Sequence, residues 1–262
     1  MIGLAGCGRM GEPMLASLRS IGLHAKGFDI VDRSPNWITT DPKRFSCDLS
    51  TLITVVRDME QTENVLFNTQ SFVTKAPMLE RLIICSTLSP KYVRALRSRI
   101  PGHIKLIDAP MSGAQVAAQR AELSFMLGGA TGDLDDAQVL FDSMGTNFHR
   151  MGEFGAGMQA KVLNNMLTAS NTAMTRMGLD WADNAELDEK AMLELISTSS
   201  GQNWLASGFN DIEFARDGYT SENTIGILGK DVELAIDAAP PEADLTAAKA
   251  IQKMIFDLKP RP

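Results

Sequence analysis

The sequence predicts an α/β protein in which a doubly wound parallel sheet in the N-terminal part is followed by an all-α part. Short apolar segments alternate with helical patterns as far as residue 151, and this alternation is typical of parallel sheets. A glycine-rich turn joins the first apolar segment to the first helical pattern. Beyond Met158 the apolar residues recur at helical spacing, and no segment has the pattern of a strand.

The N-terminal elements follow from local signals in chain order. Residues 2–5 form an apolar run before the glycines, residues 12–20 have helical spacing, and Gly22 ends that helix. Residues 34–50 are polar and rich in turn formers, and Pro90 can take the first position of a helix. Further strands are expected at 25–28, 52–56, 79–85, 104–108, 123–127 and 147–151, with 65–67 as a weak candidate, and a helix is expected at 134–144.

The C-terminal part begins with a long helical pattern over residues 158–184. This pattern exceeds the length of a typical globular helix, and such a helix often links two domains. Further helices are expected at 188–197, 222–239 and 244–258, and Pro240-Pro241 separates the last two. We therefore expect two domains, residues 1–156 with the sheet and residues 157–262 with the helices.

The composition excludes several classes of function. The net charge of −7 provides no basic patch for nucleic acid and disfavours anionic membrane surfaces. No apolar run approaches the ~20 residues that span a bilayer, and no signal peptide pattern is present, so a cytoplasmic protein is expected. The three cysteines fit neither a disulfide framework nor a metal site, and the three histidines show no ligand spacing, so free thiols and no metal are expected.

The first βαβ unit carries the fingerprint of a Rossmann dinucleotide-binding domain. Gly6 permits the tight turn, Gly8 lets the backbone approach a pyrophosphate, and Gly11 lets the helix pack on the strand. Asp29 ends the second strand, where it can accept hydrogen bonds from a ribose diol, so NAD is favoured over NADP. Arg33 keeps NADP open, because an arginine just beyond that position can hold a 2′-phosphate.

A candidate acid/base lies where the two halves of the chain meet, which is where a ligand cleft is expected. Hydride transfer to or from a carbinol must be paired with movement of the hydroxyl proton. Lys161 and Asn165 are four residues apart in a helical pattern, so they share one helix face. In a partly dry cleft beside a positively charged nicotinamide, the pKa of Lys161 would fall. The alternative is an exposed lysine on a solvated helix face.

Two further segments have both a functional and a structural interpretation. Ser112-Gly113-Ala114 follows a strand, so it is expected at the carboxyl edge of the sheet, where its hydroxyl and backbone N–H groups can hold a carboxylate. An ordinary strand-to-loop turn would look the same. Lys230-Asp231 opens a helical segment, and a surface ion pair is its structural interpretation.

Four motifs, taken together, resemble those of the β-hydroxyacid dehydrogenases, the family of 3-hydroxyisobutyrate dehydrogenase and tartronate semialdehyde reductase. Residues 3–14 resemble the cofactor loop of that family, and residues 108–114 resemble its substrate motif. Residues 155–165 resemble its catalytic motif, and Lys230-Asp231 with Leu234-Ala235 resembles its late motif. The four motifs occur in the family's order and span nearly the whole chain.

The resemblance implies a Rossmann domain followed by a helical domain of the 6-phosphogluconate dehydrogenase type, built on a long interdomain helix. It implies NAD, with NADP as the alternative, a small carboxylate substrate, and assembly as a homodimer or homotetramer. Lys161 would be the catalytic acid/base, and Asp231 would support the site. Substrate contacts would come from Ser112, Gly113, Ala114 and Asn165, and cofactor contacts from Gly6, Gly8, Arg9, Met10, Gly11, Asp29, Thr87 and Lys230.

Three departures from the family pattern leave hydride transfer credible but leave the substrate open. Ala114 and Asn223 stand where the family usually has a glycine and an aromatic residue, and Arg57-Asp58 replaces a usual Leu-Pro pair. The expected reaction interconverts a small 3-hydroxy acid, such as 3-hydroxyisobutyrate, and its semialdehyde. An imine reductase on the same scaffold and a non-catalytic dinucleotide-binding module are the alternatives, and Lys161 argues against both.

Overall fold

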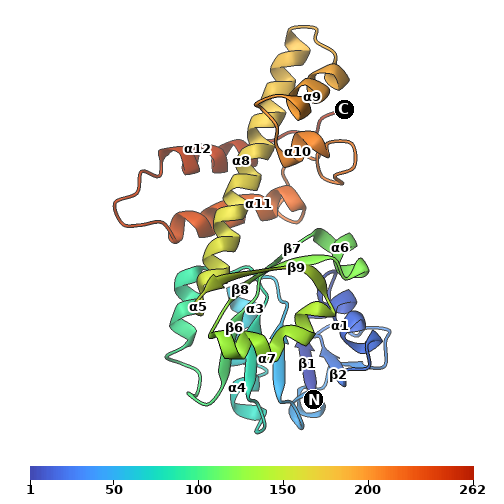
Figure 1. Ribbon diagram of the computed structural model, residues 1–262, viewed down its shortest axis with the longest axis vertical. Coiled ribbons are helices and arrows are strands. Elements are labelled where there is room, and N and C mark those ends of the chain that lie inside the picture. The colour runs from blue at the N-terminus through green and yellow to red at the C-terminus, as the bar shows by residue number, and fades with distance from the viewer. The chain divides into compact units, whose positions relative to one another are not determined.

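The computed structural model describes residues 1–262, which divide into two compact units (Figure 1). The first unit is Met1–Lys161 and the second is Val162–Pro262. The boundary falls inside one long helix, five residues beyond the division expected from the sequence, so the functional division at residues 156/157 stays a prediction. None of the helices is long and apolar enough to cross a membrane.

The first unit is built on a nine-stranded sheet. Six strands lie in the order β3-β2-β1-β4-β5-β6, and every neighbouring pair among them is parallel. Their carboxyl ends therefore share one edge of the sheet, the edge at which open α/β folds bind ligands. The bounds of these strands are β1 Ile2–Ala5, β2 Ala25–Phe28, β3 Ile38–Thr39, β4 Thr51–Thr54, β5 Arg81–Ile84 and β6 Lys105–Asp108.

The sheet is not parallel throughout, which corrects the sequence prediction in one respect. Strand β8 (Leu123–Gly128) runs antiparallel to β6 and to β7 (Met111–Ser112), and β9 (Gly145–Gly152) pairs in parallel with β8. The connection between β6 and β8 holds the seven-residue helix α6 (Ala114–Arg120). At 1.5 Å per residue this helix is only about 10 Å long, too short to return the chain along a six-residue strand of about 20 Å.

Both faces of the sheet are buried, and this gives the doubly wound architecture. Successive residues of each central strand enter opposite cores: Leu4 and Ala5, for example, belong to different apolar clusters. The same alternation separates Ile83 from Leu82 and Ile84. The covering helices are α1 Gly11–Ser20, α2 Pro42–Ser46, α3 Met59–Leu66, α4 Phe72–Lys75, α5 Pro90–Leu96, α6 and α7 Thr131–Asp142.

Two local predictions in this unit were wrong or incomplete. Residues 65–67, a weak strand candidate, belong to the end of α3, which begins at the N-cap Asp58. The Asp58 carboxylate accepts the backbone N–H of Gln61 at 2.8 Å, and this cap starts a helix before the apolar residues appear. The polar stretch 34–50 holds β3 and α2, and α2 is capped by Asp41.

The second unit is helical, as predicted. The 29-residue helix α8 (Ala156–Asn184) contributes residues to both apolar cores of the second unit (Figure 1). Ala169 and Ala173 pack with residues of α11 and α12, and Leu179 packs with residues of α9 and α10. Small residues on α8 allow this close approach of neighbouring helices. The other helices are α9 Glu189–Thr198, α10 Trp204–Ser207, α11 Thr224–Asp237 and α12 Thr246–Phe256.

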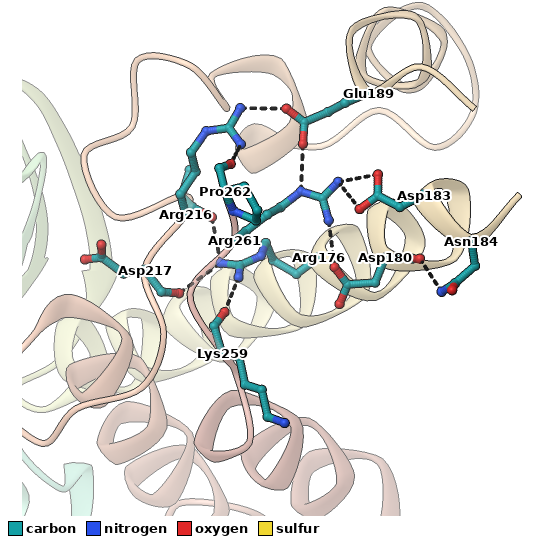
Figure 2. A network of polar contacts seen from close by, with 11 residues as sticks. Arg176, Asp180, Asp183, Asn184, Glu189, Arg216, Asp217, Lys259, Arg261 and Pro262 are labelled. Carbon is teal, nitrogen blue, oxygen red and sulfur yellow. Dashed lines mark hydrogen bonds and ion pairs between the residues drawn. The ribbon is translucent and has the colours of Figure 1, made fainter. Parts of the chain in front are cut away.

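A polar network fixes the last residues of the chain to α8 and α9. Figure 2 shows the guanidinium of Arg261 surrounded by three carboxylates, with distances of 2.7, 2.8 and 2.7 Å to Asp180, Asp183 and Glu189. The side chain of Arg261 is 5% exposed. Beside it, Arg176 donates to the backbone carbonyls of Ala215, Asp217 and Lys259 (Figure 2).

Candidate active site

The glycines of the first loop differ in what surrounds them. Gly6 has φ +96°, and a Cβ there would lie 2.5 Å from the carbonyl oxygen of Val55. A Cβ at Gly11 would lie 1.9 Å from the carbonyl oxygen of Gly6, so both positions are needed for the turn and for helix packing. Gly8 has no atom within 4 Å of such a Cβ. The fold itself does not require glycine at Gly8, and the open space there would allow the close approach that was predicted for a pyrophosphate.

A cavity of about 360 Å³ opens beside Gly8. Two guanidinium groups line it, those of Arg9 and Arg33, and Arg9 Nε donates to Gln115 Oε1 at 3.3 Å. Positive charge next to an open backbone turn suits the phosphates of a dinucleotide. The complete lining is Gly8, Arg9, Glu12, Pro13, Ala16, Arg33, Gln115 and Gln119.

Asp29 lies at the carboxyl edge of the sheet, directly after β2, and is 8% exposed. Its Oδ1 accepts the backbone N–H of Val31 at 2.9 Å, and its Oδ2 accepts from Arg33 Nε at 3.3 Å. These two contacts fix the carboxylate at the end of β2. Asp29 therefore holds Arg33 in place. The carboxylate of Asp29 suits a ribose diol and the guanidinium of Arg33 suits a 2′-phosphate, and the two groups lie next to each other.

The segment predicted to hold a carboxylate has an unusual backbone. Ser112 ends β7, Gly113 follows with φ +133°, and Ala114 begins α6 with φ +53°. An alanine in the left-handed region is strained, because its Cβ crowds the backbone. Ala114 thus keeps the conformation that glycine adopts without cost. Backbone strain of this kind clusters at active sites and ligand-binding loops.

Thr87 follows the end of β5 at the same edge of the sheet. Its neighbour Ser86 is buried, and Ser86 Oγ accepts the backbone N–H of Val56 at 2.9 Å. This bond ties the loop after β5 to the loop after β4. The parallel strands thereby bring the glycine loop, Asp29 and Thr87 to one edge from separate parts of the sequence.

Lys161 and Asn165 lie one turn apart on α8. They are 7% and 8% exposed, so the alternative of a lysine on a solvated helix face is wrong. Asn165 Nδ2 donates to Oδ2 of Asp231 on α11 at 2.6 Å, and Asp231 is 1% exposed. A surface ion pair is therefore also wrong for Asp231, while Lys230 beside it is half-buried.

Asn223, where the family usually has an aromatic residue, caps the start of α11. Its Oδ1 accepts the backbone N–H groups of Gly226 and Thr220, and its Nδ2 donates to the carbonyl of Gly218 at 2.7 Å. The amide is used in folding this turn. Its effect on the choice of substrate stays a prediction.

Asp108 is the first residue of the motif at 108–114, and no role was predicted for it. Asp108 is fully buried at the end of β6, and its carboxylate accepts backbone N–H groups from the start of α8. The signal that the sequence offered was indirect. A long helix begins next to Gly155, which has no side chain to cap it, so a group from elsewhere in the chain could supply the cap.

Two family models cover almost the whole chain. Residues 1–152 match the NAD binding domain of 6-phosphogluconate dehydrogenase, and residues 155–256 match the NAD-binding domain of NADP-dependent 3-hydroxyisobutyrate dehydrogenase. The chain belongs to the β-hydroxyacid dehydrogenase family. As a member of the β-hydroxyacid dehydrogenases it is an oxidoreductase that acts on CH–OH groups with NAD or NADP as its cofactor.

The relatives agree with this assignment over nearly the full length. A 3-hydroxyisobutyrate dehydrogenase of Pseudomonas aeruginosa is 27% identical over 98% of this chain and 91% of its own length. An NAD-dependent L-serine dehydrogenase of the same organism is 26% identical over 98% of this chain and 91% of its own. The structure of a Mycobacterium tuberculosis 3-hydroxyisobutyrate dehydrogenase with L-serine has the same fold, with a TM-score of 0.83 at 24% identity, covering 98% and 95% of the two chains.

Proposed function

We propose that this β-hydroxyacid dehydrogenase interconverts a small 3-hydroxy acid, of the kind of 3-hydroxyisobutyrate, and its semialdehyde, with Lys161 as the acid/base. The observation that carries the proposal is the burial of Lys161 one helical turn from Asn165. Burying an amine costs solvation free energy, and buried ionisable groups are concentrated at functional sites.

The residues of this chain have separate tasks in the reaction. Bound dinucleotide supplies the hydride acceptor in oxidation and the donor in reduction. Lys161 takes the hydroxyl proton of the substrate in oxidation and returns it to the carbonyl oxygen in reduction. Asn165 hydrogen-bonds the same substrate from the next turn of α8, with its amide oriented by Asp231.

The substrate carboxylate is assigned to Ser112, Gly113 and Ala114. The Ser112 hydroxyl and the backbone N–H groups of this turn are the donors that a carboxylate needs. The relatives named for 3-hydroxyisobutyrate and L-serine support a small 3-hydroxy acid, since both molecules have a carboxylate and a primary alcohol on the β-carbon.

The dinucleotide is assigned to the glycine loop and its surroundings. Gly8 and the cavity beside it support this assignment, because they leave open backbone and positive charge at the start of α1. Asp29 favours NAD through the ribose diol, and NADP stays the alternative through Arg33. The assigned contacts are Gly6, Gly8, Arg9, Met10, Gly11, Asp29, Thr87 and Lys230.

Two alternatives remain for the reaction. An imine reductase shares the scaffold but usually carries another residue in place of the lysine, and a non-catalytic module would have no use for a buried amine. Lys161 argues against both.

We further propose that the enzyme assembles as a homodimer or homotetramer through its helical part. Four large apolar side chains of α8 are exposed at spacings of four and seven residues, which keeps them on one side of the helix. A stripe of this kind is costly to leave in water and suits a helix of a second copy. The exposed residues are Leu163 44%, Leu167 61%, Met174 51% and Trp181 66%.

The acid/base assignment is tested with Lys161→Ala. General acid–base catalysis is worth about 10²–10⁴-fold, so kcat for oxidation of 3-hydroxyisobutyrate falls by that factor while the dinucleotide Kd changes little. The matched control is Lys190→Ala, which removes an exposed lysine from α9 and leaves kcat unchanged. Full turnover by the Lys161 variant would refute the assignment. Turnover of cyclic imines and not of hydroxy acids would favour the imine reductase.

A further inference from the structure

The start of α8 has no capping side chain of its own. The first N–H groups of a helix have no acceptor within the helix, and a side chain at the preceding position usually supplies one. Here that position is Gly155, with φ +94°. The acceptor comes instead from Asp108 at the end of β6: Oδ1 accepts the N–H of Gly155 at 2.6 Å, and Oδ2 accepts the N–H of Met158.

One glycine makes room for this carboxylate, and a second lets the first turn of α8 approach the backbone of the sheet. A Cβ at Gly128 would lie 2.1 Å from Asp108 Oδ1, and a Cβ at Gly157 would lie 2.3 Å from the carbonyl oxygen of Met126. Asp108 itself is 0% exposed. Burial raises the pKa of its carboxyl, against the effect of the two backbone N–H groups. Burying a carboxylate is costly, and the two backbone N–H groups offset part of that cost.

A second contact fixes the same helical turn. The sulfur of Met158 accepts the backbone N–H of Leu88 at 3.3 Å, and both side chains are buried. Leu88 lies in the loop after β5, next to Thr87. The first turn of α8 is therefore tied to the carboxyl edge of the sheet at two strands, β5 and β6.

We propose that Asp108 is a positioning residue for Lys161, which it holds in place through the first turn of α8. This inference rests on the proposed acid/base role of Lys161. Lys161 follows Met158 by three residues, which is about 4.5 Å along the helix axis. A shift or rotation of the first turn moves the amine by a similar amount, and a misplacement of 1 Å at a reacting group can cost about 100-fold in rate.

Asp108→Asn tests this with little change of volume. An asparagine keeps one acceptor oxygen but turns an NH₂ group toward one of the two backbone N–H groups, so the first turn shifts. We expect kcat to fall about tenfold or more, with the dinucleotide Kd within about twofold of the wild type. The matched control is Asp188→Ala, which removes the cap of α9, where Asp188 accepts the N–H of Ala191 at 2.8 Å. This control lowers the melting temperature and leaves kcat unchanged.

A double-mutant cycle with Lys161→Ala distinguishes positioning from general structural damage. If Asp108 acts through Lys161, Asp108→Asn changes the residual rate of the Lys161→Ala enzyme less than about twofold. Rates are measured from NADH absorbance, normalised to dinucleotide-binding sites, at a temperature well below the melting transition. The positioning role would be overturned if Asp108→Asn lowered kcat by the same factor in the wild-type and Lys161→Ala enzymes, or if it did not lower kcat in the wild-type enzyme. Either result would leave the role of Lys161 intact.

Full turnover by Lys161→Ala would instead overturn the proposed function, and the positioning role with it. Should Asp108→Asn fail to fold, Asp108→Glu is measured in the same cycle. Glutamate keeps the charge but adds a methylene next to Gly128, where the structure has no space, so it also displaces the first turn. The results expected for Asp108→Glu are those expected for Asp108→Asn: kcat falls in the otherwise wild-type enzyme and does not fall further in the Lys161→Ala enzyme.

Discussion

The amide nitrogen of Asn165 donates to Oδ2 of Asp231 at 2.6 Å, joining α8 to α11 in the interior of the helical unit. An ionised carboxylate can only accept hydrogen bonds, so it fixes which end of the amide faces it. Nδ2 is turned toward Asp231, and the carbonyl oxygen of Asn165, which accepts from Asn164 Nδ2 at 3.4 Å, has a second lone pair for another donor. A substrate hydroxyl is such a donor.

Replacing Asp231 with asparagine removes this constraint. The new amide can face Asn165 with its NH₂ group, so the Asn165 amide can turn over and offer a donor instead of an acceptor. We expect the KM for the hydroxy acid to rise by up to about tenfold, which corresponds to the loss of one neutral hydrogen bond to the substrate. Glu233→Gln on the exposed side of α11 is the control. Steady-state kinetics with unchanged KM in the Asp231 variant would show that Asn165 does not use this orientation.

Cofactor preference follows from the contact between Asp29 and Arg33. We expect a lower KM for NAD than for NADP in the wild type. Asp29→Ala removes the acceptor for the ribose diol and frees Arg33. The KM for NAD therefore rises, and the difference between the KM values for NAD and NADP becomes smaller. Arg33→Ala instead weakens NADP and spares NAD. The measurement is kcat/KM for both cofactors in the three proteins, and a wild type that prefers NADP would contradict this reading of Asp29.

The network around Arg261 predicts a stability effect in the helical unit. Arg261→Met leaves the carboxylates of Asp180, Asp183 and Glu189 close together without their shared cation. Since the carboxylates are partly exposed, we expect a loss of about 2 kcal/mol in the free energy of unfolding. The control Lys253→Met breaks an exposed pair between α12 and Asp257, the residue after that helix, and costs less than about 0.5 kcal/mol. Urea unfolding measures the free energy of unfolding of both variants. Equal unfolding midpoints for Arg261→Met and Lys253→Met would contradict the prediction.

Glu63 predicts a dependence of stability on pH. Hydrogen bonds from Arg99, which outweigh the opposing effect of burial, and from Tyr92 hold the pKa of Glu63 below its ordinary value. A lowered pKa in the folded state adds stability that is complete above the ordinary Glu pKa of about 4.3 and is lost as the pH falls through the lowered value.

The free energy of unfolding of Glu63→Gln is therefore expected to fall below that of the wild type at pH 7, by at most about 1 kcal/mol because Arg99 is 41% exposed. The difference between the two proteins shrinks toward pH 3. Denaturant unfolding at several pH values measures it, and a gap that widened on acidification would contradict the assignment.

Local patterns were enough for much of this molecule. The glycine turn with its strand and helix, the order of the elements, the long helix and the shared face of Lys161 and Asn165 depend on residues a few positions apart. Backbone conformation and hydrophobic periodicity act over that range, so they are visible in the sequence. The overlooked helix α3 is marked by its cap Asp58 rather than by periodicity, and the two-residue strand β3 is defined by its pairing with β2.

The tertiary structure decided what depends on residues far apart in the chain. The antiparallel course of β8, the cap that Asp108 gives to α8 from 47 residues away, and the bond between Asn165 and Asp231 have no local signal. The burial of Lys161 also has no local signal, and it excluded the alternative of a lysine on a solvated helix face. Each of these depends on which surfaces exclude water together, and that is settled when the whole chain packs.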